Sequence, residues 1–253
     1  MRRIAIIAAA ALAAGAANAE IVGEPHSYTV GDMEFEGYVA TNTNASPRGT
    51  VVIVHDWDGL TGYERRRADM LAAMGYTAFA IDVYGAERRP QSMDENRAFS
   101  RALYEDRDTF RERLLGSLAQ VENIAGGSDG VVMIGYCFGG AAVLEAARAG
   151  ADADGFVSFH GGLGTPEGQS YDDASGPILL LHGSADPVSG MADLAAVIDE
   201  MQGAGVTHAA EIYGGARHSF TVWGSGDYDV AADRASWEAL GEFLEANLPA
   251  GGS

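Results

Sequence analysis

The chain of 253 residues carries 36 acidic and 16 basic side chains, which give a formal net charge of −20. This charge repels phosphate backbones and anionic membranes, so it disfavours nucleic acid and membrane surfaces as partners. All the basic residues are arginines and Cys137 is the single cysteine, which excludes lysine Schiff-base and P-loop chemistry, an internal disulfide and a thiolate metal cluster.

The first 19 residues are predicted to be a cleavable signal peptide. Arg2 and Arg3 precede an alanine-rich apolar run, and residues 17–19 have the small-residue pattern of a cleavage site. The run is shorter than the roughly 20 apolar residues that span a bilayer. We therefore expect a periplasmic or secreted protein whose mature chain, residues 20–253, forms one domain.

The rest of the chain alternates between strand and helix patterns. Short strands at 27–30 and 35–40 are expected to form an edge hairpin. The continuous apolar run at 50–55 indicates a strand that is covered on both faces, and further strand patterns follow it, separated by helical spacing. These strands are expected at 50–55, 76–82, 130–135, 154–161, 177–183 and 207–215, and helices at 63–75, 139–150, 189–203 and 229–248. The alternation predicts an α/β fold with a mostly parallel sheet and ligands at the carboxyl ends of its strands.

The segment 86–113 is the most charged part of the chain and is expected to form solvated helix faces with i,i+4 ion pairs. Residues 114–125 are expected to continue the helix. An alternative is that arginines of this segment lie over a pocket and bind an anionic substrate. The candidates are Arg88, Arg89, Arg97 and Arg101.

Cys137 lies in the sequence GYCFG, between a predicted strand and a predicted helix. The pattern Gly-x-nucleophile-x-Gly is typical of a nucleophile elbow, in which side chains at the flanking positions Gly135 and Gly139 would clash. The N-terminus of the following helix directs N–H groups at the nucleophile. The alternative is a small cysteine packed under a helix, with the glycines serving close packing.

A nucleophile needs a base and a carboxylate that orients the base. Asp186, in LHGSADP, and His218, in YGGARHSF, each follow a predicted strand downstream of Cys137. The order nucleophile, acid, histidine is that of hydrolases with a nucleophile elbow, and all three positions fall at the same edge of the sheet. The sequence thus predicts a catalytic triad of Cys137, Asp186 and His218.

These motifs, together with HDWDGLTGYERRRADMLAAMGYTAFAIDVYG upstream, resemble the dienelactone hydrolase family of α/β-hydrolases over about residues 28–247. The resemblance implies an α/β-hydrolase fold and an enzyme that cleaves small esters or lactones through a thioester intermediate, with no cofactor and no metal. It also implies a carboxylate near the resting cysteine, here Asp56 or its neighbour Asp58. By analogy, the oxyanion hole would use the backbone N–H groups of Trp57 and Phe138.

The substrate is expected to be a small neutral, fairly apolar ester or lactone. The prototype of the family binds a substrate carboxylate with arginines, one of them four residues after the catalytic histidine, where this chain has Val222. Arg217 is an alternative anchor. His160 ends a predicted strand at the same edge and is expected either to contact substrate or to be structural. A monomer is favoured.

The competing hypothesis is a non-catalytic binding or thiol redox-sensing protein on the same scaffold, because a thiol at a helix N-terminus is also readily oxidised. A sensor usually needs a resolving cysteine, and this chain has none. The acid and base loops in hydrolase order favour the enzyme.

Overall fold

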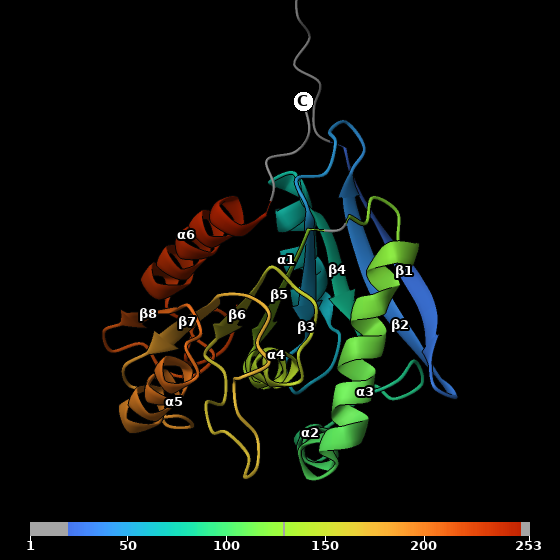
Figure 1. The fold of residues 1–253 in the computed structure, drawn as a ribbon. Coiled ribbons are helices and arrows are strands. Elements are labelled where there is room, and N and C mark those ends of the chain that lie inside the picture. Colours follow the sequence, from blue (N-terminus) through green and yellow to red (C-terminus); the bar gives the residue numbers. More distant parts are fainter. Residues whose placement is uncertain (1–19, 129, 249–253) are drawn as a thin grey trace, which may run out of the picture.

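The computed structural model describes residues 20–128 and 130–248, and the predicted signal peptide lies outside them. One eight-stranded sheet runs through the molecule in the order β1-β2-β4-β3-β5-β6-β7-β8 (Figure 1). Strands β3 to β8 are parallel, and the β1–β2 hairpin joins β4 antiparallel at one edge. The strands are β1 (Ile21–Val30), β2 (Met33–Asn42), β3 (Thr50–Val54), β4 (Thr77–Ile81), β5 (Val131–Tyr136), β6 (Gly155–Phe159), β7 (Ile178–Gly183) and β8 (His208–Tyr213).

The apolar runs form the centre of this sheet, as predicted. Every residue of β3, β4, β5, β6 and β7 is buried. Helices cover both faces of these strands, so both side-chain rows must be apolar and the alternation typical of a half-exposed strand disappears. The edge hairpin does alternate, and its strands are longer than the sequence patterns predicted.

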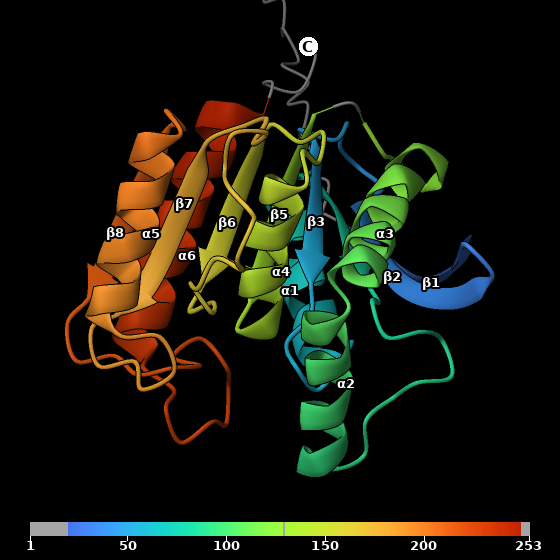
Figure 2. The same cartoon turned by 60° about the horizontal axis from the view of Figure 1, so that its bottom comes forward.

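The helices cover the two faces of the sheet unequally (Figure 2). Val52 and Val54 of β3 face one hydrophobic core, which α2, α3, α4 and α5 close. Their neighbours Val51 and Ile53 face the second core, which α1 and α6 close. The helices are α1 (Gly62–Ala73), α2 (Met93–Glu105), α3 (Arg107–Leu118), α4 (Phe138–Arg148), α5 (Met191–Gly203) and α6 (Val230–Asn247).

The charged segment forms two helices that meet at Asp106. The Asp106 carboxylate accepts hydrogen bonds from the backbone N–H of Thr109 at 3.1 Å and from its hydroxyl at 2.8 Å, which caps the start of α3. The residues after 113 continue α3 to Leu118, and the chain then tightens into a 3-10 turn over Ala119–Asn123. No helix in the described parts of the chain has the length and apolar character to cross a bilayer.

The parallel strands bring distant parts of the sequence to one edge of the sheet. Asp56 follows β3, Cys137 follows β5, Asp186 follows β7 and His218 follows β8. Because these strands run in the same direction, the four residues lie at the carboxyl ends, where open α/β sheets bind ligands.

Candidate active site

Cys137 occupies a sharp turn between the last residue of β5 and the first residue of α4, with φ of 52° and ψ of −109°. A Cβ on Gly135 would lie 2.1 Å from the carbonyl oxygen of Gly139. A Cβ on Gly139 would lie 2.1 Å from the carbonyl oxygen of Val54. Both glycines are therefore required by close backbone approach, as the elbow pattern predicted.

A chain of hydrogen bonds links the three residues that the motifs singled out. His218 Nε2 lies 3.0 Å from Cys137 Sγ, and His218 Nδ1 lies 2.7 Å from Asp186 Oδ2. The second Asp186 oxygen accepts the backbone N–H groups of Val188 at 2.7 Å and Ser189 at 3.2 Å. A carboxylate can only accept at His218 Nδ1, so Nε2 is left free to accept the thiol proton.

The electrostatics of the site favour the protonated form of the Cys137 thiol. Burial opposes a negative charge on Asp186, but the His218 hydrogen bond and charge and the two backbone N–H groups lower its pKa overall. Burial, followed by the charge and hydrogen bond of Asp56, raises the pKa of Cys137 well above its ordinary value. The backbone N–H of Phe138 donates toward the sulfur and opposes this rise. The helix N-terminus alone therefore does not decide the state of the thiol.

Asp56 lies buried in the loop after β3 and binds both the thiol and a backbone donor. Its Oδ1 accepts the Trp57 N–H at 2.5 Å. Burial, with nearby Asp58, raises the pKa of Asp56 to about 6. The N–H group of Trp57 that the resemblance assigned to the oxyanion hole is thus already bonded to Asp56 in this resting arrangement.

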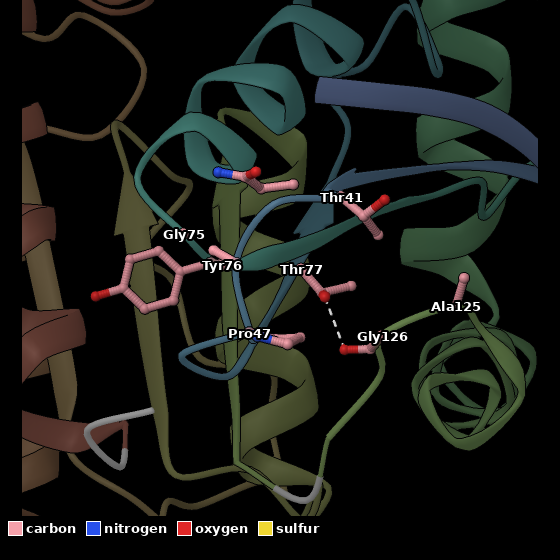
Figure 3. Close-up of a pocket in the computed structure, with 9 residues that line it drawn as sticks. Thr41, Pro47, Gly75, Tyr76, Thr77, Ala125 and Gly126 are labelled. Atoms are coloured by element: carbon pink, nitrogen blue, oxygen red, sulfur yellow. Dashed lines mark hydrogen bonds between the residues drawn. The ribbon is translucent and has the colours of Figure 1, made fainter. Parts of the chain in front are cut away.

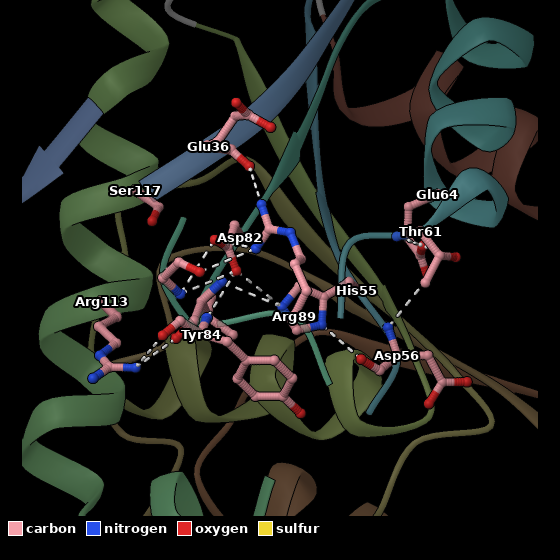
Figure 4. A network of polar contacts seen from close by, with 12 residues as sticks. Glu36, His55, Asp56, Thr61, Glu64, Asp82, Tyr84, Arg89, Arg113 and Ser117 are labelled. Carbon is pink, nitrogen blue, oxygen red and sulfur yellow. Dashed lines mark hydrogen bonds and ion pairs between the residues drawn. The ribbon is translucent and has the colours of Figure 1, made fainter. Parts of the chain in front are cut away.

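Glu64 braces the same loop from the first turn of α1 (Figure 4). Its carboxylate accepts the Asp56 N–H at 3.3 Å and both the N–H and the hydroxyl of Thr61 at 2.8 Å. Burial raises the pKa of Glu64 to about 7. The sequence analysis missed this residue, although Thr-x-x-Glu at 61–64 is a capping-box pattern that could have identified it.

His55 supports the start of the loop after β3. The Val83 N–H donates to His55 Nε2 at 3.2 Å, so the opposite nitrogen carries the proton and donates to the Asp56 carbonyl oxygen at 2.6 Å. The His55 ring also packs against the rings of Tyr84 and Phe138.

Aromatic rings form the wall next to the elbow. The Phe138 ring contacts Tyr84, Tyr104 and Phe110, with centroids 5.3 to 5.6 Å apart. The Tyr84 hydroxyl donates to the Trp57 carbonyl oxygen at 2.9 Å, which ties the wall to the loop after β3. Phe138, Tyr84 and Phe110 are almost fully buried, so this wall is the part of the hydrophobic core that supports the elbow.

Three of the four arginines of the charged segment that were candidates for anion binding have acidic partners, and Arg88 forms no ion pair with the described residues. Arg89 pairs with Asp82, Arg97 with Asp94 and Arg101 with Glu105. Arg217 pairs with Asp227 at 2.8 Å across its own loop. Val222 lies half-buried in the His218 loop.

His160 lies behind the elbow and is fully buried. Its Nδ1 faces the backbone N–H of Cys137 at 3.1 Å, and its Nε2 lies 2.7 Å from Thr221 Oγ1. Both ring nitrogens have partners inside the protein, which favours the structural alternative of the two roles expected for His160.

A cavity of about 170 Å³ lies at the opposite end of the sheet, away from Cys137 (Figure 3). Gly75, Tyr76 and Thr77, which precede or start β4, line it, and Thr77 Oγ1 donates to the Gly126 carbonyl oxygen at 2.7 Å. Within the described residues, no three His, Cys, Asp or Glu side chains form a group that could hold a metal ion.

The parallel sheet, the strand–turn–helix elbow and the edge that gathers Cys137, Asp186 and His218 define an α/β-hydrolase fold. Residues 35–248 match the model of the dienelactone hydrolase family, and the chain belongs to that family. It is a hydrolase of ester bonds.

Solved structures agree with this assignment. A dienelactone hydrolase-like promiscuous phosphotriesterase from metagenomic libraries is 29% identical, with 90% of this chain and 99% of that chain covered and a TM-score of 0.84. A dienelactone hydrolase from Anabaena variabilis is 19% identical, with 90% and 99% covered and a TM-score of 0.66. A thermophilic esterase from Thermogutta terrifontis is 18% identical, with 88% and 92% covered and a TM-score of 0.64, and these last two likenesses show the fold alone. A search of curated proteins finds no match.

Proposed function

We propose that the protein cleaves small neutral esters or lactones with Cys137 as nucleophile, His218 as base and Asp186 as the acid that orients His218. The observation that carries this proposal is the continuous chain from Cys137 Sγ through His218, at 3.0 Å, to Asp186, at 2.7 Å. These separations are within the reach of proton transfer between a nucleophile and its base.

In the first step, His218 Nε2 takes the thiol proton and the sulfur attacks the carbonyl carbon. The carbon–oxygen bond of the ester then breaks, and the leaving alkoxide takes the proton from His218. Water next gives a proton to His218 and attacks the thioester carbon, which releases the acid and the thiolate of Cys137. The proton on His218 returns to the sulfur, so that no cofactor or co-reactant is consumed.

Asp56 modulates this nucleophile. At rest it bonds both the thiol and the Trp57 N–H, so it keeps the sulfur neutral and occupies one of the two donors assigned to the oxyanion hole. A substrate carbonyl that binds to Trp57 and Phe138 displaces the Asp56 carboxylate. The thiol proton is then free to move to His218, which couples activation of the nucleophile to substrate binding. It also shields a thiol in an oxidising compartment.

The preference for neutral substrates follows from the surroundings of the sulfur. Asp56 and Asp58 make the loop after β3 acidic, which disfavours an anionic group beside the sulfur. Two of the candidate anchors, Arg89 and Arg217, are paired with acids. A neutral phosphotriester is a second candidate substrate, because the 29% identical relative is described as a promiscuous phosphotriesterase.

The test is hydrolysis of neutral activated esters, lactones and a phosphotriester by the purified protein, with Cys137→Ala and Cys137→Ser in parallel. We expect ester or lactone turnover in the wild type and loss of at least about 10³-fold in Cys137→Ala. An anionic ester of matched length should be a poorer substrate. No turnover across the panel would favour the binding or redox-sensing alternative, and oxidation of Cys137 by peroxide would then be measured.

We also propose that residues 1–19 direct export and are removed. N-terminal sequencing of protein purified from a periplasmic or culture fraction should begin at Glu20. Protein that retains Met1 in the cytoplasmic fraction would contradict export.

A further inference from the structure

A buried polar chain joins the elbow to the loop that carries His218. The Cys137 N–H is shared between the Phe159 carbonyl oxygen at 3.0 Å and His160 Nδ1 at 3.1 Å. His160 Nε2 lies 2.7 Å from Thr221 Oγ1, three residues after His218. His160 and Thr221 are both fully buried, so water does not compete for these bonds.

The bonding partners select one form of His160. A backbone N–H can only donate, so Nδ1 accepts from Cys137 and the proton must lie on Nε2, which donates to Thr221. Burial, with His218 nearby, lowers the pKa of His160 well below its ordinary value, so the ring is neutral. The imidazole is thus held as a single neutral tautomer.

Thr221 is itself bonded to α1 and, through Arg67, connected to α6. Its Oγ1 lies 2.7 Å from the Tyr63 hydroxyl, which also accepts from Arg67 Nε at 3.2 Å. Arg67 donates to the Thr221 carbonyl oxygen at 3.0 Å and pairs with Asp233 of α6. The position of the His218 loop is therefore fixed through both the side chain and the backbone of Thr221.

The backbone positions with strained conformations lie in this hydrogen-bonded chain or next to it. Among the described residues, three non-glycine residues have positive φ: Cys137 at 52°, His160 at 40° and Ser219 at 56°. Such conformations cost free energy and persist only where surrounding contacts hold them. His160 is hydrogen-bonded directly to Cys137 and, through Thr221, to the loop that contains Ser219. The ring of His160 also meets the ring of His218 edge to face, with centroids 5.5 Å apart.

We propose that His160 is a positioning residue. Through its bonds to Cys137 and Thr221 it fixes the elbow and the His218 loop relative to each other and so maintains the contact between Cys137 and His218. The inference rests on the proposed mechanism, in which that contact transfers the proton. His160 contacts neither the substrate nor the sulfur in this role.

The test compares Thr221→Val, which removes the hydroxyl but keeps the shape, with Thr221→Ser, which keeps the hydroxyl. The matched control is Thr77→Val, which removes a buried hydroxyl bond of equal length, 2.7 Å, at the far end of the sheet (Figure 3). Each variant is measured for kcat, KM, melting temperature and the rate at which iodoacetamide alkylates Cys137. Should Thr221→Val not fold, Tyr63→Phe removes the next hydroxyl in the chain.

We expect Thr221→Val to lose about tenfold in kcat and in alkylation rate with KM unchanged, because the hydroxyl bond is worth about one power of ten in rate. Tyr63→Phe should lose about threefold on the same basis. Thr221→Ser and Thr77→Val should stay within about twofold of the wild type. Equal kcat and alkylation rates in Thr221→Val and wild type, or an equal loss in Thr77→Val, would overturn the positioning role.

Alkylation needs no ester, which separates this inference from the proposed function. A chain that shows the expected alkylation pattern but hydrolyses no substrate refutes the hydrolase mechanism and supports the positioning of the thiol. A chain that hydrolyses esters with both readouts unchanged in Thr221→Val supports the mechanism and refutes the role of His160.

Discussion

Replacement of Asp56 by asparagine should change how stability depends on pH. The Asp56 side chain is buried, at 7% exposure, and its pKa is raised from 3.8 to about 6. When folding raises the pKa of a carboxyl group, the group contributes its full stabilisation at pH values below its pKa in the unfolded state. That contribution is lost as the pH rises through its pKa in the folded state. The rise of roughly 2 pH units corresponds to about 3 kcal/mol.

Asparagine has no charge to desolvate and retains an oxygen that can accept the Trp57 N–H. The unfolding free energy of Asp56→Asn minus that of the wild type should therefore increase by about 3 kcal/mol as the pH is raised from about 3.5 to about 8. Urea unfolding at a series of pH values measures this difference directly. Asp94→Asn is the control, because that side chain is 95% exposed on α2, and its curve should parallel the wild type. If the unfolding free energy of Asp56→Asn differs from that of the wild type by the same amount at every pH, the argument from the burial of Asp56 is refuted.

Three further outcomes follow from the site. Asp56→Asn should speed alkylation of Cys137 by iodoacetamide at neutral pH, because a charge that raises the thiol pKa is gone; an unchanged rate–pH profile would show that Asp56 does not hold the thiol neutral. Asp186→Asn should lower kcat by about 10³-fold or more at similar KM, because His218 loses the acceptor that orients it; steady-state kinetics with a loss under tenfold would contradict this. Gly139→Ala should abolish soluble folded protein, since its Cβ would lie 2.1 Å from a backbone oxygen, whereas Gly203→Ala, with nothing within 4 Å, should melt normally in a thermal scan.

The sequence predicted the central strands and the nucleophile, base and acid positions because each has a local signal. Buried parallel strands are continuous apolar runs, and the elbow requires glycines on both sides of Cys137. The order of the loops after those strands then places Asp186 and His218 near Cys137 without any knowledge of distances.

The contacts behind the site could not be predicted in this way. His160 and Thr221 are 61 positions apart, and neither lies in a pattern that signals a hydrogen bond between them. The ion pair of Arg217 with Asp227 depends on how one loop folds back on itself. Such partners are set by tertiary packing, which single-sequence patterns do not encode, whereas Glu64 had a local capping signal that was overlooked.

The central claim is that Cys137 forms a thioester with the acyl group of the substrate. The most direct test is to mix the protein with an activated neutral ester, quench in acid within milliseconds to seconds, and measure intact mass and the modified peptide. The mechanism predicts a transient increase by the mass of the acyl group, located at Cys137 and released by hydroxylamine. Hydrolysis at full rate with no adduct at Cys137, or turnover retained in Cys137→Ala, would contradict it.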